Sequence, residues 1–163
     1  MVDPPKKYKR LSPGVCVRLR GGYCIIANDY VADADGNVTE VHAEVLSGTI
    51  GTNPPEGIRC KGAIHWVSAK YGVKAEVRLY DRLVSDEAPD ANPEGFLASL
   101  NKDSLTVLTD AVVEPALAEA PAEFLCQFER TGYFVADRYD HSAEHPVFNR
   151  AVSLRDSWAK MNK

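Results

Sequence analysis

The residue types in this chain that could carry out chemistry are histidines, cysteines and a group of cations near the N-terminus. Histidine acts as a general base or a metal ligand only when a partner lies at a suitable distance. His141 and His145, with Asp140 and Glu144 beside them, come closest to a set of metal ligands, but their spacing and the following proline fit a loop as well as a helix face. Glycine-rich phosphate loops, Gly-x-Ser-x-Gly and His-Glu-x-x-His motifs are absent from the sequence. We therefore expect no catalytic residue and no metal site, with histidines in structural or surface roles.

The four cysteines offer thiol chemistry only if the fold brings them together. Cys16, Cys24, Cys60 and Cys126 contain no Cys-x-x-Cys pair, and their spacing matches neither a zinc site nor a small disulfide-rich framework. The first residues include lysines but no apolar segment with a cleavage site, so no secretory signal is predicted. We expect reduced thiols in structural roles and a chain located in the cytoplasm.

The clearest chemical signal is cationic. Residues 1–20 carry six lysines and arginines against one aspartate, a net charge of +5, whereas the rest of the chain sums to −9. A basic edge on an acidic body argues against indiscriminate binding along nucleic acid, and it leaves room for a local surface that contacts phosphates or bases. The alternative is a solvated tail without a partner.

The segment that positions two of these cations has the pattern of a β-strand. Residues 15–20 alternate apolar and polar side chains, so Arg18 and Arg20 should share the face opposite the apolar residues. Turn-forming residues at 33–37 then precede a β-branched segment at 38–45. Together these features predict a basic strand followed by a hairpin.

Further short segments typical of β-strands are separated by glycine, proline and asparagine: residues 60–67, 74–83, 104–113, 123–129, 133–137 and 147–154. Helical signals occur only at 93–100 and 154–160. This pattern predicts an all-β fold of two small antiparallel β-barrels with one or two short helices. The polar, proline-rich stretch 85–93 predicts a boundary between a first barrel at 6–86 and a second at 87–163.

Composition is that of a soluble globular protein. The apolar fraction is 45% and the charged fraction 26%, and no apolar run approaches the roughly 20 residues that cross a bilayer. Aromatic side chains supply the large apolar surface that small barrels need, so we expect most of these to lie in the core: Trp66, Tyr80, Phe128, Tyr133, Phe134, Phe148 and Trp158.

Seven segments, taken in order, resemble the C-terminal half of bacterial glutaminyl-tRNA synthetases. They are residues 8–11, 17–20, 61–68, 76–83, 127–134, 146–150 and 154–158. One such segment is weak evidence, but seven in one order over nearly the whole chain make chance similarity a poor explanation. The resemblance implies two β-barrels, related to the barrel of the ribosomal protein that binds 5S rRNA, which hold the anticodon of the glutamine tRNA.

The resemblance implies that Gln127 and Arg130, in the Gln-Phe-Glu-Arg segment, contact the middle anticodon base. The glutamine amide and the planar arginine guanidinium suit the Watson–Crick edges of splayed bases. Because these two residues are three positions apart, a regular strand would point their side chains to opposite faces. The turn at Thr131 and Gly132 must therefore begin early enough to bring Arg130 round. In the family an arginine in preceding strands helps to close this pocket, so we expect an incomplete pocket and an incomplete second barrel.

The same resemblance places Lys9 and Arg10 near the third anticodon base and its phosphate. It also places Arg20, with Arg18 beside it, near the first base. Lys7 stands where bacterial relatives commonly carry a glutamine, which favours a phosphate contact over contact with a base.

The family further implies that the parent protein ligates glutamine to its tRNA, with ATP and Mg bound in a catalytic domain whose signatures this sequence lacks. We therefore expect the chain to bind the glutamine tRNA as a monomer, with no cofactor and no activity of its own, and to bind neither DNA nor a membrane. The alternatives are the corresponding region of a glutamyl-tRNA synthetase, a free-standing RNA-binding barrel protein, and a purely structural or protein-interaction domain. Residues 46–53 depart most from the family, which puts any tRNA contact in that loop in doubt.

Overall fold

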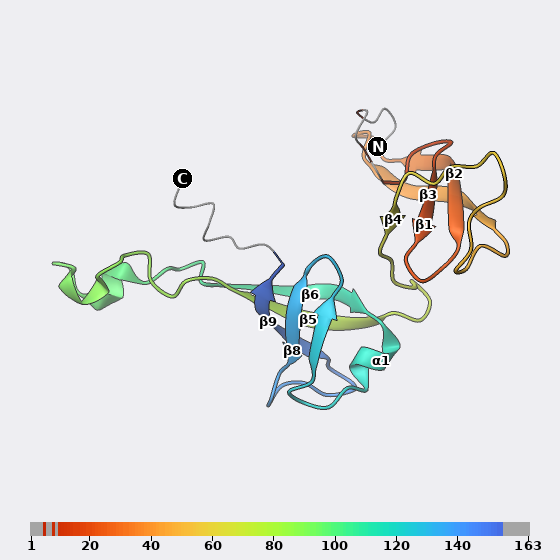
Figure 1. Cartoon of the computed structure of the whole chain (residues 1–163). Coiled ribbons are helices and arrows are strands. Elements are labelled where there is room, and N and C mark those ends of the chain that lie inside the picture. The colour runs from red at the N-terminus through yellow and green to blue at the C-terminus, as the bar shows by residue number, and fades with distance from the viewer. Residues whose placement is uncertain (1–4, 6–7, 9, 155–163) are drawn as a thin grey trace. The chain divides into compact units, whose positions relative to one another are not determined.

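The computed structural model describes residues 5, 8 and 10–154. The chain divides into two compact units, Met1–Trp66 and Val67–Lys163, and each unit contains one β-sheet (Figure 1). Lys7, Lys9 and Trp158 lie outside the described residues, as does most of the helix predicted at 154–160. Within the described part of the chain, no helix is long and apolar enough to span a membrane.

The sheet of the first unit has the strand order β3-β2-β1-β4. Its strands are β1 (Cys16–Leu19), β2 (Cys24–Ala32), β3 (Val38–Leu46) and β4 (Ala63–Ile64). The predicted hairpin is confirmed, since β2 and β3 pair antiparallel around the turn at Asp33. The Asp33 carboxylate accepts hydrogen bonds from the backbone N–H of Asn37 at 2.8 Å and of Asp35 at 3.0 Å. This side chain therefore closes the turn.

A disulfide joins Cys16, the first residue of β1, to Cys60 in the loop before β4. The prediction that all four cysteines are reduced is wrong for this pair, whereas Cys24 and Cys126 are free. Sequence spacing did not reveal the pair because parallel pairing of β1 with β4 brings together residues 44 positions apart. The backbone N–H of Lys61 donates to the carbonyl oxygen of Cys16 at 3.0 Å and holds the two segments together at this point.

The sheet of the second unit has the strand order β6-β5-β9-β8-β7. Its strands are β5 (Val73–Tyr80), β6 (Leu105–Val113), β7 (Leu125–Phe128), β8 (Gly132–Ala136) and β9 (Val147–Ser153), and the short helix α1 (Pro115–Ala118) follows β6. Phe134 and Phe148 are fully buried. The ring of Phe128 stacks on Phe134 with centroids 4.2 Å apart and meets Phe148 edge-on at 5.3 Å. These three rings form the centre of the core.

The segment between β5 and β6 carries two 3-10 helices, η1 (Pro89–Ala91) and η2 (Phe96–Ser99). Figure 1 shows that this segment projects away from the strands of its sheet. It contains the 85–93 stretch that predicted the domain boundary. The structure differs, because β5 pairs with β6 and β9 and so belongs to the second sheet. The division therefore falls between Trp66 and Val67 instead of after residue 86.

The all-β prediction is confirmed, but the sheets differ from the predicted antiparallel barrels. Each contains one parallel pair, β1 with β4 and β5 with β9. Among the described residues neither sheet closes, because the two outer strands of each order do not pair with each other. The aromatic core prediction holds for the three phenylalanines. It is wrong for Trp66, Tyr80 and Tyr133, whose exposed fractions are 49%, 47% and 48%.

A polar network connects β5, β9 and the loop after β8. Asp137 accepts a hydrogen bond from the Asn149 side chain at 2.7 Å, and its carboxylate lies 3.4 Å from the guanidinium of Arg78. The backbone N–H groups of Tyr139 and Asp140 donate to its other oxygen, both at 2.9 Å. These hydrogen bonds, that of Asn149 foremost, lower the pKa of Asp137 to about 2. The guanidinium of Arg78 also pairs with Asp140 at 2.7 Å, which raises the pKa of Arg78.

Candidate nucleic-acid interface

The described residues that were predicted to contact RNA come from both units. Arg10, Arg18 and Arg20 belong to the first unit, and Gln127 and Arg130 belong to the second. The side chain of Arg18 is half-buried, and the other four are exposed. A polar side chain must be exposed to contact RNA. Four of the five residues meet this requirement fully, and Arg18 meets it only in part.

Arg18 lies in β1, and its guanidinium binds main-chain oxygens of the loop that follows β3. It donates a hydrogen bond to the carbonyl oxygen of Thr49 at 2.5 Å and another to that of Thr52. Charge-assisted hydrogen bonds of this kind are among the stronger ones in proteins. The guanidinium of Arg18 therefore binds the loop after β3 to the sheet and does not extend into solvent.

The loop at 46–53 is held in place by a buried threonine as well. Thr49 is 2% exposed, and its hydroxyl accepts a hydrogen bond from the backbone N–H of Cys24 at 2.8 Å and donates to the carbonyl oxygen of Leu46 at 2.6 Å. Sequence analysis had singled out this loop only for its departure from the family. The positioning role of Thr49 was missed because the pairing of a loop residue with a distant strand leaves no local pattern.

Arg20 follows β1, where the chain turns toward β2. Its backbone is held on both sides: the N–H of Arg20 donates to the carbonyl oxygen of Ile64 at 2.9 Å, and the carbonyl oxygen of Arg20 accepts from the indole N–H of Trp66 at 3.0 Å. Its side chain is exposed. Trp66 therefore positions Arg20, a role that sequence analysis missed because the two residues lie 46 positions apart and no local pattern joins them.

Gln127 and Arg130 lie on the hairpin of β7 and β8. Gln127 pairs with Tyr133 inside the hairpin, and β7 ends at Phe128, two residues before Arg130. The N–H of Thr131 donates to the carbonyl oxygen of Phe128 at 2.8 Å, which makes Arg130 the third residue of a tight turn. The structure meets the requirement that the strand end before Arg130.

The backbone of Arg130 adopts a conformation that L-amino acids avoid. Its φ is 63°, in the left-handed region, where a side chain costs about 1–2 kcal/mol relative to ordinary backbone. Turns of this kind favour glycine or asparagine at the third position. Unfavourable backbone conformations concentrate at functional sites because the surrounding structure holds them there. Among the described residues, Glu123 is the other non-glycine residue with this conformation, at a φ of 65°.

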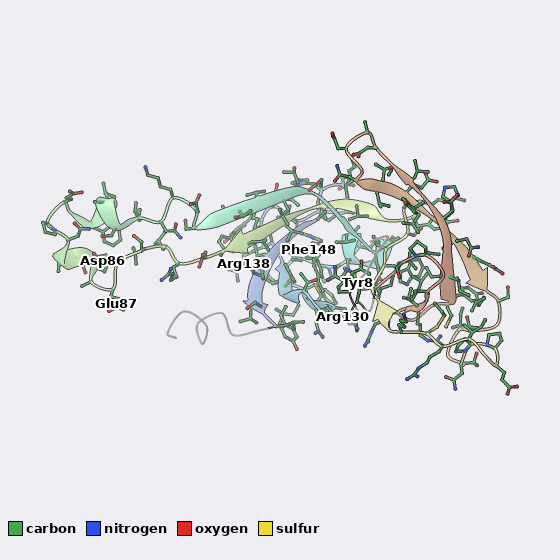
Figure 2. All side chains as sticks on the ribbon, turned by 90° about the horizontal axis from the view of Figure 1, so that it is seen from above. Tyr8, Asp86, Glu87, Arg130, Arg138 and Phe148 are labelled. Atoms are coloured by element: carbon green, nitrogen blue, oxygen red, sulfur yellow. A yellow bond between two sulfur atoms is a disulfide. The ribbon has the colours of Figure 1, made fainter. Side chains whose placement is uncertain are left out.

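Next to this turn the chain packs closely against β9. Arg130 and Thr131 line a shallow hollow together with Ser153 and Leu154, in the unit where Arg130 and Phe148 can be followed in Figure 2. A Cβ atom at Gly132 would lie 2.7 Å from the carbonyl oxygen of Val152, so only glycine fits at that position. The turn is therefore anchored against β9 immediately after Arg130.

His141, the residue considered as a metal ligand, has a structural role. Its Nδ1 accepts a hydrogen bond from the backbone N–H of Val147 at 3.1 Å, so Nε2 carries the proton and donates to the carbonyl oxygen of Ala120 at 3.0 Å. The ring also meets Phe148 edge-on. With both ring nitrogens bound to main chain, His141 joins the segment before β7 to the start of β9.

Exposed residues of each unit carry side-chain groups that suit contact with nucleic acid. Gln127, on the outer strand β7, carries an amide group, and Arg130 and Arg20, in turns, carry guanidinium groups; all three residues are exposed. Such groups recognise the edges of unpaired bases, and cations such as Arg10 contact phosphates.

Residues 63–137 match the family model described as the anticodon-binding domain of class I tRNA synthetases (E and Q). The match identifies residues 63–137 as a member of that family of anticodon-binding domains. The matched region includes β5 to β8 and both Gln127 and Arg130. The resemblance seen in the sequence is therefore confirmed at the level of the family.

Curated relatives extend the similarity to almost the whole chain. A glutamine–tRNA ligase of Ralstonia nicotianae is 53% identical over 158 residues, and one of Cupriavidus taiwanensis is 54% identical over 158 residues; each match covers 96% of this chain and 27% of the relative. A glutamine–tRNA ligase of Pseudomonas aeruginosa is 52% identical over 159 residues, which cover 96% of this chain and 28% of that protein. The chain thus spans about a quarter of the length of the relatives it matches.

Proposed function

We infer that this anticodon-binding domain recognises the anticodon loop of the glutamine tRNA, as part of a protein that ligates glutamine to that tRNA. The inference is supported by 52–54% identity to glutamine–tRNA ligases over 96% of the chain. One structural observation carries it further: the residue predicted to contact the middle base, Arg130, sits in a tight turn with a φ of 63°. ATP and Mg act in the catalytic part of such a ligase, and this chain binds tRNA as a monomer without a cofactor and without activity of its own.

At the middle base, Gln127 and Arg130 act together. The Gln127 amide offers one donor and one acceptor from an exposed strand position, and Arg130 presents a planar fork from the adjoining turn. A rigid turn lowers the entropy lost when the arginine side chain is ordered on a base.

In the first unit, Arg20 contacts the first base, and Arg10 contacts the third base and its phosphate, with Lys7 and Lys9 as further phosphate contacts. The hydrogen bonds of Arg18 to the loop after β3 support a positioning role for that residue. Arg18 then affects RNA binding through the loop and through β1, on which the turn at Arg20 depends.

The test is binding of the chain to three anticodon stem-loops at two salt concentrations. The stem-loops carry the glutamine anticodon, the same anticodon with its middle base changed, and a glutamate anticodon. We expect the first to bind most tightly, because loss of one good base contact costs about 1–3 kcal/mol, or roughly 5- to 150-fold in affinity. Equal, weak and strongly salt-dependent binding of all three would overturn the assignment of base recognition and leave only phosphate contacts.

Matched variants locate the preference within the chain. Arg130→Ala should reduce discrimination at the middle base, whereas Arg10→Ala should weaken binding to every stem-loop and reduce its salt dependence. Arg138→Ala is the control, because Arg138 is an exposed arginine of the same unit that pairs with Glu123. Tighter binding of the glutamate stem-loop by the unmodified chain would instead assign the domain to a glutamyl-tRNA synthetase.

A further inference from the structure

The first unit contains a cluster of three cysteines that RNA binding does not use. The sulfur atoms of Cys16, Cys24 and Cys60 all lie within 4.8 Å of one another. Cys16 and Cys24 are buried, and Cys60 is partly exposed. We propose that these three residues, when reduced, bind one thiophilic metal cation, and that the Cys16–Cys60 disulfide is the oxidised, metal-free state of the same site.

Three separate segments bring the sulfurs together. In the pairing of β1 with β2, Cys24 lies opposite Arg18, so Cys16 and Cys24 project from the same face of the sheet as diagonal neighbours. Cys60 approaches from the loop before β4, where the N–H of Lys61 donates to the carbonyl oxygen of Cys16 at 3.0 Å. A cation bound here cross-links the paired strands β1 and β2 to the loop before β4.

The sulfurs lie close enough for one small soft cation to reach all three once the disulfide is reduced. Zinc–sulfur bonds of about 2.3 Å in tetrahedral geometry place two thiolates about 3.8 Å apart, so the sulfurs of Cys16 and Cys60 must separate on reduction, and the sulfur of Cys24 already lies within 4.8 Å of both. Three protein ligands leave the fourth coordination position to water. Cys60, partly exposed, gives water access to the cluster from one side. Arg59 and Lys61, both exposed, flank Cys60 and offset the negative charge of the thiolates.

The packing of the first unit gives a reason for such a cross-link. Its buried apolar side chains, within the described residues, are Cys16, Val17, Cys24, Ile25 and Ala27. None of these is aromatic, whereas the second unit buries two phenylalanines. Small units with little core commonly depend on a disulfide or a metal ion for stability. Because two of the five core residues are themselves cysteines, the cluster is part of that core.

The two states interconvert by ordinary thiol chemistry. A dithiol reductant attacks the Cys16–Cys60 bond through a mixed disulfide, so that two electrons and two protons pass to the protein and the reductant itself becomes a disulfide. The protein then holds three thiols. A divalent cation replaces the thiol protons, which leave to solvent, and the sulfurs become its ligands.

The test is metal binding by the full chain in its two redox states. The chain is reduced with a dithiol under anaerobic conditions, freed from the reductant, and titrated with Zn²⁺ by calorimetry and with Co²⁺ by absorption, since sulfur-to-cobalt charge transfer reports thiolate ligands. We expect one equivalent of metal bound to the reduced chain, a rise in its unfolding temperature with Zn²⁺, and no such binding to the oxidised chain.

Two variants distinguish this site from other thiols. Cys24→Ser should lower Zn²⁺ affinity of the reduced chain at least tenfold while leaving the Cys16–Cys60 disulfide able to form, so its folding can be verified in the oxidised state. Cys126→Ser, in the second unit, should bind Zn²⁺ as the unmodified chain does. Absence of binding by the reduced chain, unchanged affinity in Cys24→Ser, or loss of binding in Cys126→Ser would each overturn the proposal.

Discussion

Replacing Arg130 by glycine and by alanine separates the contribution of its side chain from that of its backbone. Both variants remove the guanidinium, but only glycine adopts a φ of 63° without a steric cost. The left-handed conformation costs about 1–2 kcal/mol for a residue with a Cβ atom. Glycine loses part of this advantage, about 0.4–1 kcal/mol, through the greater entropy of its unfolded state. We therefore expect Arg130→Gly to be more stable than Arg130→Ala by about 1 kcal/mol.

Thermal unfolding measures this difference directly. In a unit of about 100 residues, 1 kcal/mol corresponds to roughly 4–8 °C in unfolding temperature, and the second unit is of this size. Urea unfolding followed by circular dichroism provides a second estimate with an independent probe. Equal stabilities of the two variants would show that Arg130 does not hold the left-handed conformation in solution.

In RNA binding, unlike in stability, we expect the same two variants to behave alike. If the guanidinium makes the contact, both lose discrimination at the middle base to the same degree, despite their difference in stability. Arg130→Lys keeps the charge but lacks the planar fork, so it should retain overall affinity better than discrimination. Discrimination preserved in Arg130→Ala would refute the role assigned to this side chain.

Three further perturbations follow from the packing and hydrogen bonds. Gly132→Ala should destabilise the second unit by about 1–3 kcal/mol, because its Cβ would meet the carbonyl oxygen of Val152 at 2.7 Å; urea unfolding measures the loss, and an unchanged midpoint would contradict the close approach. The pKa of Asp137 is lowered to about 2, so its contribution to the free energy of unfolding is complete above pH 4 and is lost as the pH falls toward 2. In acid unfolding experiments the stability of Asp137→Asn should therefore depend less on pH over this range than that of the unmodified chain. Trp66→Phe removes the hydrogen bond to Arg20, and we expect a stability loss of only about 0.5–1.5 kcal/mol but weaker binding to the glutamine stem-loop; unaffected binding would argue against a positioning role.

Local features of the fold could be predicted from the sequence with good accuracy. The segment predicted at 104–113 is the strand Leu105–Val113, and the turn at 33–37 closes the hairpin of β2 and β3. These elements depend on side-chain alternation and on turn residues, which are visible along the chain. The strand predicted at 60–67 shortens to Ala63–Ile64, which among the described strands pairs with β1 alone.

Long-range features could not be predicted in the same way. The two parallel pairings, β1 with β4 and β5 with β9, join segments far apart in sequence and determine where the units divide. The Cys16–Cys60 pair was missed for the same reason. Each depends on which strands meet in space, and no local pattern encodes that choice.

The residues of the candidate site could be predicted from the sequence, but their three-dimensional contacts could not. Resemblance to a family identified Gln127, Arg130 and Arg20 as candidates and grouped Arg18 with them, but it did not show that the guanidinium of Arg18 binds main-chain oxygens. Arg18 belongs with Arg20 to the basic segment predicted at 15–20, yet its hydrogen bonds go to main chain. Hydrogen-bond partners of this kind become visible only in three dimensions.

The anchorage of Arg18 has a consequence for how the loop after β3 can evolve. Arg18 binds carbonyl oxygens at residues 49 and 52, and every amino acid supplies a carbonyl oxygen. Substitutions at exposed positions such as Ile50 and Asn53 therefore leave the anchorage intact, whereas an insertion or deletion between 49 and 52 would displace its acceptors. The loop can thus drift in sequence at constant length, and it offers a place where new side chains can be introduced without disturbing β1.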